Sequence, residues 1–165
     1  MAIADALLME LDQEAKTTQK VLDRVPESKL GWKPHAKSFS LGQLALHVAG
    51  AQGGIANMAS QDTYEIGPMI QKEAATKKEI LEALTQGTAN AKQVLGKMDD
   101  ARLMATWTLT KNGNVLMSIP RAAMVRALMM NHIYHHRGQL SVYLRLLDVP
   151  VPSIYGPSAD ENPFG

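Results

Sequence analysis

The stretch Met130-Asn131-His132-Ile133-Tyr134-His135-His136-Arg137-Gly138-Gln139 lies in the last long amphipathic segment of the chain. Ser118 and Pro120 begin this segment, which reaches about Leu147 and has the apolar spacing of a helix. His132 and His136 are four residues apart in it. Their Cβ atoms would be about 5–6 Å apart on a helix, so both imidazoles can bind one metal ion.

A helical wheel at about 100° per residue predicts which way this helix faces. The predicted core-facing stripe is centred on His132 and contains Val125, Leu128, Met129, His136, Gln139, Tyr143, Leu146 and Leu147. Arg137 falls on the far side, where we expect a structural salt bridge or an interface contact, and His135 falls at the edge. Two histidines within a core-facing stripe need polar partners, because an unpaired buried polar group costs about 1–3 kcal/mol. A shared metal ion would supply the partner; the alternative is a metal-free core of hydrogen-bonded imidazoles.

Three amphipathic segments precede this one. Apolar residues at helical spacing predict a first helix over about residues 2–23. Ser40 and Gln43 have the pattern of a capping box that begins a second helix, and Thr76 and Glu79 have the pattern of another that begins a third.

The connections complete the predicted architecture. Residues 61–75 contain Gly67 and Pro68 and have the length of a crossover between the second and third helices. Asn112-Gly113, flanked by β-prone residues, indicates a small hairpin before the last helix. The sequence therefore predicts one all-α domain over residues 1–165, a four-helix bundle with an extended tail at 149–165.

Composition limits the possible functions. The chain has 165 residues, 17 basic and 16 acidic residues and a net charge of +1, without a basic run, which argues against a nucleic-acid binder. No apolar run is long enough to span a membrane, and we see no signal peptide, so a cytoplasmic location is the default expectation. The absence of cysteine excludes disulfides, thiolate ligands and a cysteine nucleophile.

A third metal ligand has to come from another helix. The remaining candidates are His35, in a predicted loop, and His47, in the second helix. His47 shares a stripe with Ala51 and Gly54, whose small side chains would leave room for a metal-bound water or a substrate. We therefore expect His47 to be the third ligand, since bundle sites are built from facing helices, and His35 to be a solvated loop residue.

Four further residues are candidates for a supporting or catalytic role. Gln139 lies one turn beyond His136, where it would either hydrogen-bond to the site or pack between helices. Tyr143 would either donate to a substrate or be a core tyrosine. Arg121 falls on the histidine face about three turns earlier and would either meet an anionic substrate or lie at the surface. Tyr155 would either cover the site or anchor the tail.

A resemblance adds to these expectations. The segment Gln43-Leu44-Ala45-Leu46-His47, together with His132-Ile133-Tyr134-His135-His136-Arg137-Gly138-Gln139-Leu140, resembles the DinB/YfiT-like family of proposed metalloenzymes. Trp32-Lys33-Pro34 and the tail at residues 150–158 are also similar to that family, so the likeness covers nearly the whole chain. It implies a four-helix bundle, a divalent metal on His47, His132 and His136, and commonly a homodimer. The characterised branches of that family include thiol S-transferases and isomerases that use low-molecular-weight thiols.

The residues and the resemblance together lead to three functional hypotheses. The first is a metal-dependent enzyme whose open coordination position activates a small thiol for transfer onto a small electrophile. The second is a metal-dependent hydrolase, although no general base stands out and Asp62, Glu65 and Glu73 lie in the crossover. The third is a non-catalytic, dimeric metal-binding or stress-related helical protein. Zinc or nickel is the expected ion, with iron or manganese as alternatives.

Overall fold

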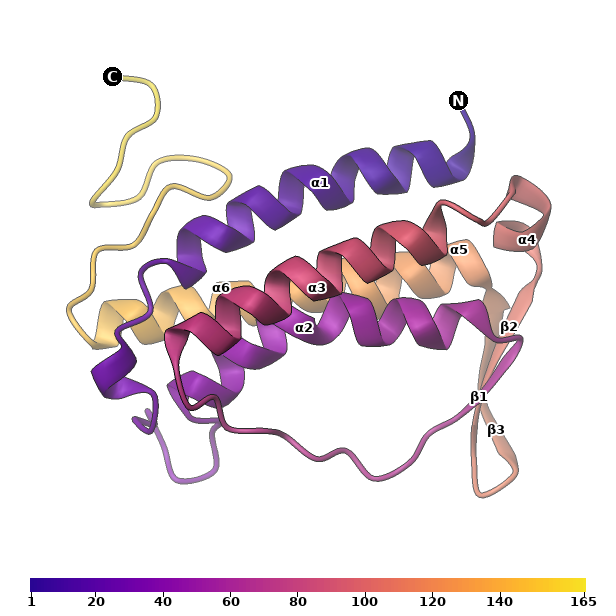
Figure 1. Cartoon of the computed structure of the whole chain (residues 1–165), viewed down its shortest axis with the longest axis horizontal. Helices are drawn as coiled ribbons and strands as arrows, with labels where there is room; N and C mark the ends of the chain where they lie inside the picture. Colours follow the sequence, from indigo (N-terminus) through magenta and orange to yellow (C-terminus); the bar gives the residue numbers. More distant parts are fainter.

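Four long helical segments pack together in the structure, a computed structural model that describes residues 1–165 (Figure 1). They are α1 (Ile3–Leu22), α2 (Leu41–Ser60), α3 (Lys77–Leu95) and a composite segment of α5 (Arg121–Met124), η2 (Val125–Met130) and α6 (Asn131–Leu146). Shorter helical elements are η1 (Glu27–Lys29) and α4 (Asp100–Met104). None of the helices is long and apolar enough to cross a membrane.

The helix starts agree with the capping patterns in the sequence. The Ser40 side chain accepts from the Gln43 backbone N–H at 3.0 Å, and the Gln43 side chain accepts from the Ser40 N–H at 3.0 Å. This reciprocal pair is the predicted capping box, which satisfies N–H groups that have no partner inside the helix. At α3, Thr76 accepts from the Glu79 N–H as predicted, but the Glu79 carboxylate accepts from the Ala75 N–H instead of that of Thr76.

A small sheet corrects the all-α prediction. It has the order β1-β2-β3, with β1 at Thr63–Glu65, β2 at Thr106–Lys111 and β3 at Asn114–Pro120. The predicted hairpin joins β2 and β3 through Asn112 and Gly113, which both have positive φ (51° and 76°). The crossover contributes the strand that the sequence did not reveal, β1, which pairs in parallel with β2. Three residues are too few to show an alternating pattern, so this strand forms because a neighbouring edge is available.

Close contact between α2 and α3 brings the middle of the fold together. A Cβ added at Gly53 would lie 2.8 Å from the Cα of Gly87, so the two backbones meet at a distance that only glycine permits here. Buried apolar residues form two clusters, one toward the sheet around Trp107 and one toward the opposite end around Leu44 and Leu140. This core fixes the spacing between α2 and α6, which together carry the three histidines of interest.

The inward face of α6 differs from the predicted one. Its buried residues are Ile133, Arg137, Leu140 and Leu144. His132 and His136 lie beside this face and are only half-buried. The cause is the π-helix η2, in which each turn contains about one residue more than an α-turn. A wheel at about 100° per residue therefore misplaces the residues before η2 relative to those of α6.

Arg137 shows the consequence of this phase change. Its side chain is 1% exposed, although the wheel placed it on the far side. It makes the expected salt bridge, at 2.6 Å to Glu14 of α1, and it also donates to the hydroxyls of Thr18 and Tyr155. Tyr155 in turn donates to Glu14 at 2.8 Å, so it anchors the tail and does not cover the histidines.

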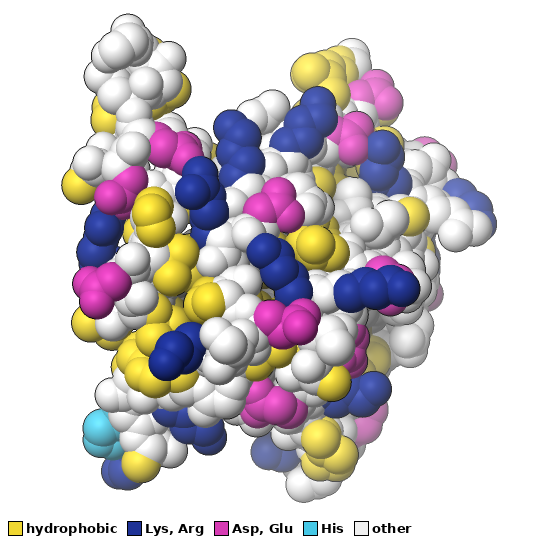
Figure 2. Space-filling model, turned by 60° about the vertical axis from the view of Figure 1, so that its left-hand side comes forward, with side chains coloured by type: hydrophobic (Ala, Val, Ile, Leu, Met, Phe, Trp, Pro, Cys, Tyr) yellow, Lys and Arg dark blue, Asp and Glu magenta, His cyan; other side chains and the backbone are white.

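Further ion pairs hold the tail against the helices. Glu161 pairs with Arg24 at 2.5 Å, and Asp160 pairs with Arg145 of α6. Figure 1 shows the tail returning past the C-terminal end of α1. On the face drawn in Figure 2, Lys and Arg side chains are interspersed with Asp and Glu, and no large area carries one sign of charge.

Candidate metal centre

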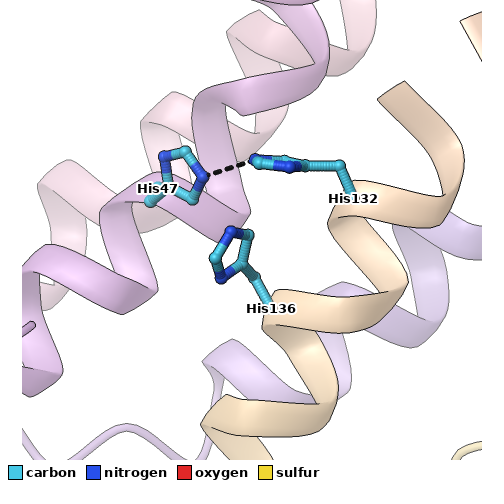
Figure 3. Close-up of side chains that lie close together, drawn as sticks. All are labelled: His47, His132 and His136. Atoms are coloured by element: carbon cyan, nitrogen blue, oxygen red, sulfur yellow. Dashed lines mark hydrogen bonds between the residues drawn. The ribbon is translucent and has the colours of Figure 1, made fainter. Parts of the chain in front are cut away.

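His47, His132 and His136 point toward one another across the gap between α2 and α6 (Figure 3). The ring centroids are 4.4 Å apart for His132 and His136, 4.6 Å for His47 and His136, and 5.0 Å for His47 and His132. One ligand nitrogen from each residue lies within 4.8 Å of the others. The structure therefore brings together the three residues that the sequence nominated from two distant segments.

The donor set suits a transition-metal ion. Two nitrogens bound to one tetrahedral ion at about 2.0–2.1 Å are roughly 3.3 Å apart. The separation of the Nε2 atoms of His47 and His132 is 2.7 Å, and the three ligand atoms all lie within 4.8 Å of one another, so small movements of the side chains would bring them to that spacing. No Cys, Asp or Glu belongs to the cluster, so three imidazoles would leave at least one coordination position open.

The contact between His47 and His132 also has a metal-free interpretation. At 2.7 Å one Nε2 donates a hydrogen bond to the other, which partners both half-buried rings. This bond does not involve His136, whose ring nonetheless lies against both of the others. In this interpretation His136 has its own partner, because its Nδ1 lies 2.7 Å from Oε1 of Gln139, but the convergence of all three rings is left unexplained.

Gln139 orients the third imidazole. Its Oε1 lies 2.7 Å from Nδ1 of His136, so the Nδ1–H group donates to it and the Nε2 lone pair stays free. An acceptor on the far nitrogen of a ligating histidine fixes the tautomer and the ring orientation. Gln139 is thus a positioning residue that acts through His136.

We expect Gln139→Ala to weaken metal binding by about 10–100-fold, the usual effect of removing such an acceptor. Gln139→Glu keeps an acceptor for the Nδ1–H group and should retain most of the affinity. Competition titrations against a chromogenic chelator measure both variants. Equal affinities for Gln139→Ala and wild type would show that this hydrogen bond does not position the ligand.

All three imidazoles are held in their neutral, metal-binding form. Burial, followed by the proximity of His136 and His132, lowers the pKa of His47 from 6.5 to about 4. Burial is also the main cause that lowers the pKa values of His132 and His136. At neutral pH the nitrogen lone pairs are therefore available without loss of a proton.

The lowered pKa of His47 predicts acid sensitivity of the metal-free protein. Above about pH 6.5 the imidazole is neutral in the folded and the unfolded chain, so it has no effect on the pH dependence. Between about pH 6.5 and 4 the unfolded chain takes up the proton and the folded chain does not, so acidification favours unfolding. The melting temperature in the presence of chelator should therefore fall more steeply over this range for wild type than for His47→Gln. Parallel curves would contradict the pKa assignment.

Tyr143 has a structural position at the edge of the site. Its hydroxyl donates to the carbonyl of Phe39 at 3.3 Å, and its ring meets Trp32 edge-on at a centroid distance of 5.6 Å. These contacts tie the loop before α2 to α6. The Phe39 ring lies 6.2 Å from that of His47, so the loop forms one side of the histidine cluster.

The position of Arg121 contradicts both expectations from the sequence. Its side chain is fully buried, so it is neither a surface arginine nor open to an anionic substrate. The guanidinium donates to the carbonyls of Ala59, Arg102 and Gln61 at 2.7, 2.6 and 3.1 Å, and to Asp62 at 2.6 Å. Arg121 therefore joins the end of α2 to the start of the last helical segment.

The remaining histidines lie outside the cluster. His135 is exposed, with its ring 4.9 Å from that of His136. His35 is an exposed loop residue, as expected, and its Nδ1 accepts from the Lys37 N–H at 3.1 Å.

An apolar cleft of about 460 Å³ opens beside His47 and His132. Ala51 and Gly54 line it, which agrees with the room that their small size predicted. The sequence did not reveal the opposite wall, which comes from residues 66–69 of the crossover and from Tyr64 and Leu109 of the sheet. No periodic pattern marks residues 64–69, because they belong to a three-residue strand and to loop.

The acidic residues of the crossover are bound elsewhere. Asp62 pairs with Arg102 and Arg121 at 2.5 and 2.6 Å. The carboxylate of Glu65 accepts from the Thr110 hydroxyl and the Asn112 N–H, and Glu73 accepts from the Ser40 hydroxyl. None of the three is part of the histidine cluster.

Comparison with known proteins agrees with this architecture. A model of the DinB family matches residues 1–162. The chain is 27% identical over 163 residues to the uncharacterized protein YrdA of Bacillus subtilis strain 168, covering 95% of this chain and 90% of that protein. A DinB-like protein from Bacillus cereus ATCC 10987 has a similar fold, with a TM-score of 0.73 and 22% identity over 92% of this chain and 97% of that one. The DinB-like protein YjoA of Bacillus subtilis has a TM-score of 0.67 and 15% identity over 90% and 97% of the two chains.

Proposed function

This chain belongs to the DinB family, and we propose that it is a metal-dependent enzyme that transfers a low-molecular-weight thiol onto a small electrophile. The observation that carries the proposal is the convergence of three neutral imidazoles beside an apolar cleft that two of them line. Three protein ligands and an open position are the arrangement typical of catalytic metal sites. A divalent ion bound there, zinc or nickel by its preference for imidazole, would lower the pKa of a thiol and so supply a nucleophile at neutral pH.

The side chains of the protein divide the remaining tasks. His47, His132 and His136 supply nitrogen ligands that are already deprotonated, because burial lowers their pKa values. Gln139 holds the His136 ring in one tautomer through its Nδ1–H group. The cleft beside His47 and His132 holds the electrophile and excludes water from it.

Transfer is favoured over hydrolysis by the placement of the acidic residues. A general base within hydrogen-bond reach of the attacking water would assist a metal-dependent hydrolase. Asp62, Glu65 and Glu73 are the acidic residues of the crossover, and each is bound to a partner outside the histidine cluster. A thiol is acidic enough to react as its anion without such a base, so thiol transfer fits the residues that are present.

Monochlorobimane provides a direct test, since a thiol displaces its chloride and the product is fluorescent. The carbon–sulfur bond forms as the carbon–chlorine bond breaks, and the thiol proton passes to the buffer. Zinc- or nickel-loaded protein should accelerate this reaction with cysteine or glutathione, and His132→Ala should abolish the acceleration while His135→Ala retains it. No acceleration by protein shown to contain the metal, across a panel of small thiols and electrophiles, would contradict the proposed activity.

A further inference from the structure

We propose that the cleft beside the histidines selects an uncharged, apolar substrate and rejects anionic ones. This inference rests on the proposed function, since it assigns the chemistry of the electrophile that the cleft would hold. The inference concerns the side chains that line the cleft, so probe binding tests it and metal content tests the proposed function.

The walls carry no compensating charge. Thirteen residues line the cleft, eight of them hydrophobic, and none is Lys, Arg, Asp or Glu. The α2 wall contributes Ile55 and Met58, and the facing side contributes Leu109 and Leu128. The side chains of these walls offer an anionic group no cation in place of the water it would lose, whereas an apolar group would gain by leaving water.

Two arginines at the end of α2 bind groups outside the cleft. Arg121 is fully buried, and its guanidinium donates to three carbonyls and to Asp62. Arg102 pairs with the same Asp62 and donates to the Ser60 carbonyl. Neither lines the cleft, so the two guanidiniums at the end of α2 are engaged in structural contacts.

The π-helix links this apolar wall to the metal ligands. Leu128 lies inside η2 and His132 lies four residues later at the start of α6, and both line the cleft. Single π turns within α-helices are frequently found at functional sites. Here the turn combines an apolar contact and a ligand nitrogen in one wall, so a molecule against Leu128 is adjacent to the histidines.

Gly54 is the position at which the cleft can be filled without disturbing the core. It lines the cleft from the middle of α2, and a Cβ added there would meet no atom within 4 Å. Leucine is a better helix former than glycine, so Gly54→Leu should fold. Its side chain would occupy the space that the substrate needs.

The test uses N-phenyl-1-naphthylamine, which is neutral, and its sulfonated analogue 8-anilino-1-naphthalenesulfonate, both of which fluoresce in apolar sites. Titrations are made with metal-free and metal-loaded wild-type protein, Gly54→Leu and Gly138→Leu. Gly138 is a matched control, because it is an exposed glycine in the middle of α6, has no atom within 4 Å of an added Cβ, and does not line the cleft.

We expect wild type and Gly138→Leu to bind the neutral probe, and Gly54→Leu to bind it about tenfold more weakly or not at all. In the metal-free state, which reports on the walls alone, the sulfonated probe should bind wild type at least about tenfold more weakly than the neutral one. Equal binding of the two probes to metal-free wild type, no binding of the neutral probe to wild type, or equal binding of that probe by Gly54→Leu and Gly138→Leu would overturn the inference. A change in oligomeric state caused by Gly54→Leu alone would also overturn it, because the cleft would then be an interface between copies.

The metal content of the same proteins separates this inference from the proposed function. Gly54→Leu should bind the metal as wild type does. If the neutral probe binds as expected but no protein takes up metal, the cleft assignment stands and the metal proposal fails. If metal is bound but the neutral probe is not, the metal proposal stands and the cleft assignment fails.

Discussion

Replacing His132 with alanine is expected to lower the affinity for zinc or nickel by at least about 100-fold, more than the loss of an outer hydrogen bond would. His132 contacts both of the other ligands: its Nε2 is 2.7 Å from that of His47, and its ring centroid is 4.4 Å from that of His136. Without it, two imidazoles remain on different helices. Isothermal titration of chelator-treated protein with each metal gives the affinity directly.

His135→Ala is the matched control for that experiment. It removes an imidazole from the same turn of the same helix, but an exposed one that lies outside the cluster. Its affinity should equal that of wild type, and both variants should melt close to the metal-free wild type when chelator is present. A loss of affinity in His135→Ala comparable to that in His132→Ala would show that the wrong residues of α6 have been assigned.

Arg121→Met is expected to lower the free energy of unfolding by about 3–5 kcal/mol, the largest stability effect that we predict. The substitution removes the guanidinium N–H groups that donate to the carbonyls of Ala59, Gln61 and Arg102. The bond to Ala59 is buried and those to Arg102 and Gln61 are partly buried. A buried acceptor left without its donor costs about 1–3 kcal/mol, and the partly buried acceptors add to that loss. Urea denaturation monitored by circular dichroism measures the change.

Arg102→Met controls for the shared ion pair. Arg102 also bonds to Asp62 and to a carbonyl at the end of α2, but its side chain is 38% exposed, whereas that of Arg121 is fully buried. Exposed ion pairs contribute about 0–1 kcal/mol, so this variant should lose no more than roughly 1–2 kcal/mol. Equal losses in the two variants would indicate that Asp62, and not the buried carbonyls, accounts for the stabilisation by Arg121.

The sequence was informative where local chemistry determines structure. The Ser40–Gln43 capping box fixed the start of α2, and Asn112-Gly113 fixed the hairpin, because each depends on a few neighbouring residues. The histidine cluster was also predictable, since two histidines at helical spacing suggested a third on a facing helix and the family resemblance agreed with His47. Small residues beside His47 then indicated the side on which the cleft opens.

Features that depend on distant contacts were not predictable. The strand β1 exists through its pairing with β2, more than forty residues later, and its three residues carry no pattern of their own. The burial of Arg121 depends on where the end of α2 places its carbonyls. The π-helix η2 changed the face of α6 that packs inward, which moved Arg137 into the core and the histidines to its edge. No residue within η2 indicates a π-helix, so a wheel at a constant angle per residue could not predict it.

The most direct test of the central claim is the metal content of untagged protein purified without chelator, determined by inductively coupled plasma mass spectrometry after dialysis against excess zinc or nickel. The geometry of His47, His132 and His136 predicts about one bound ion per chain. No retained zinc or nickel in wild-type protein would contradict the metal centre, and would leave the 2.7 Å contact between His47 and His132 as a hydrogen bond within the fold.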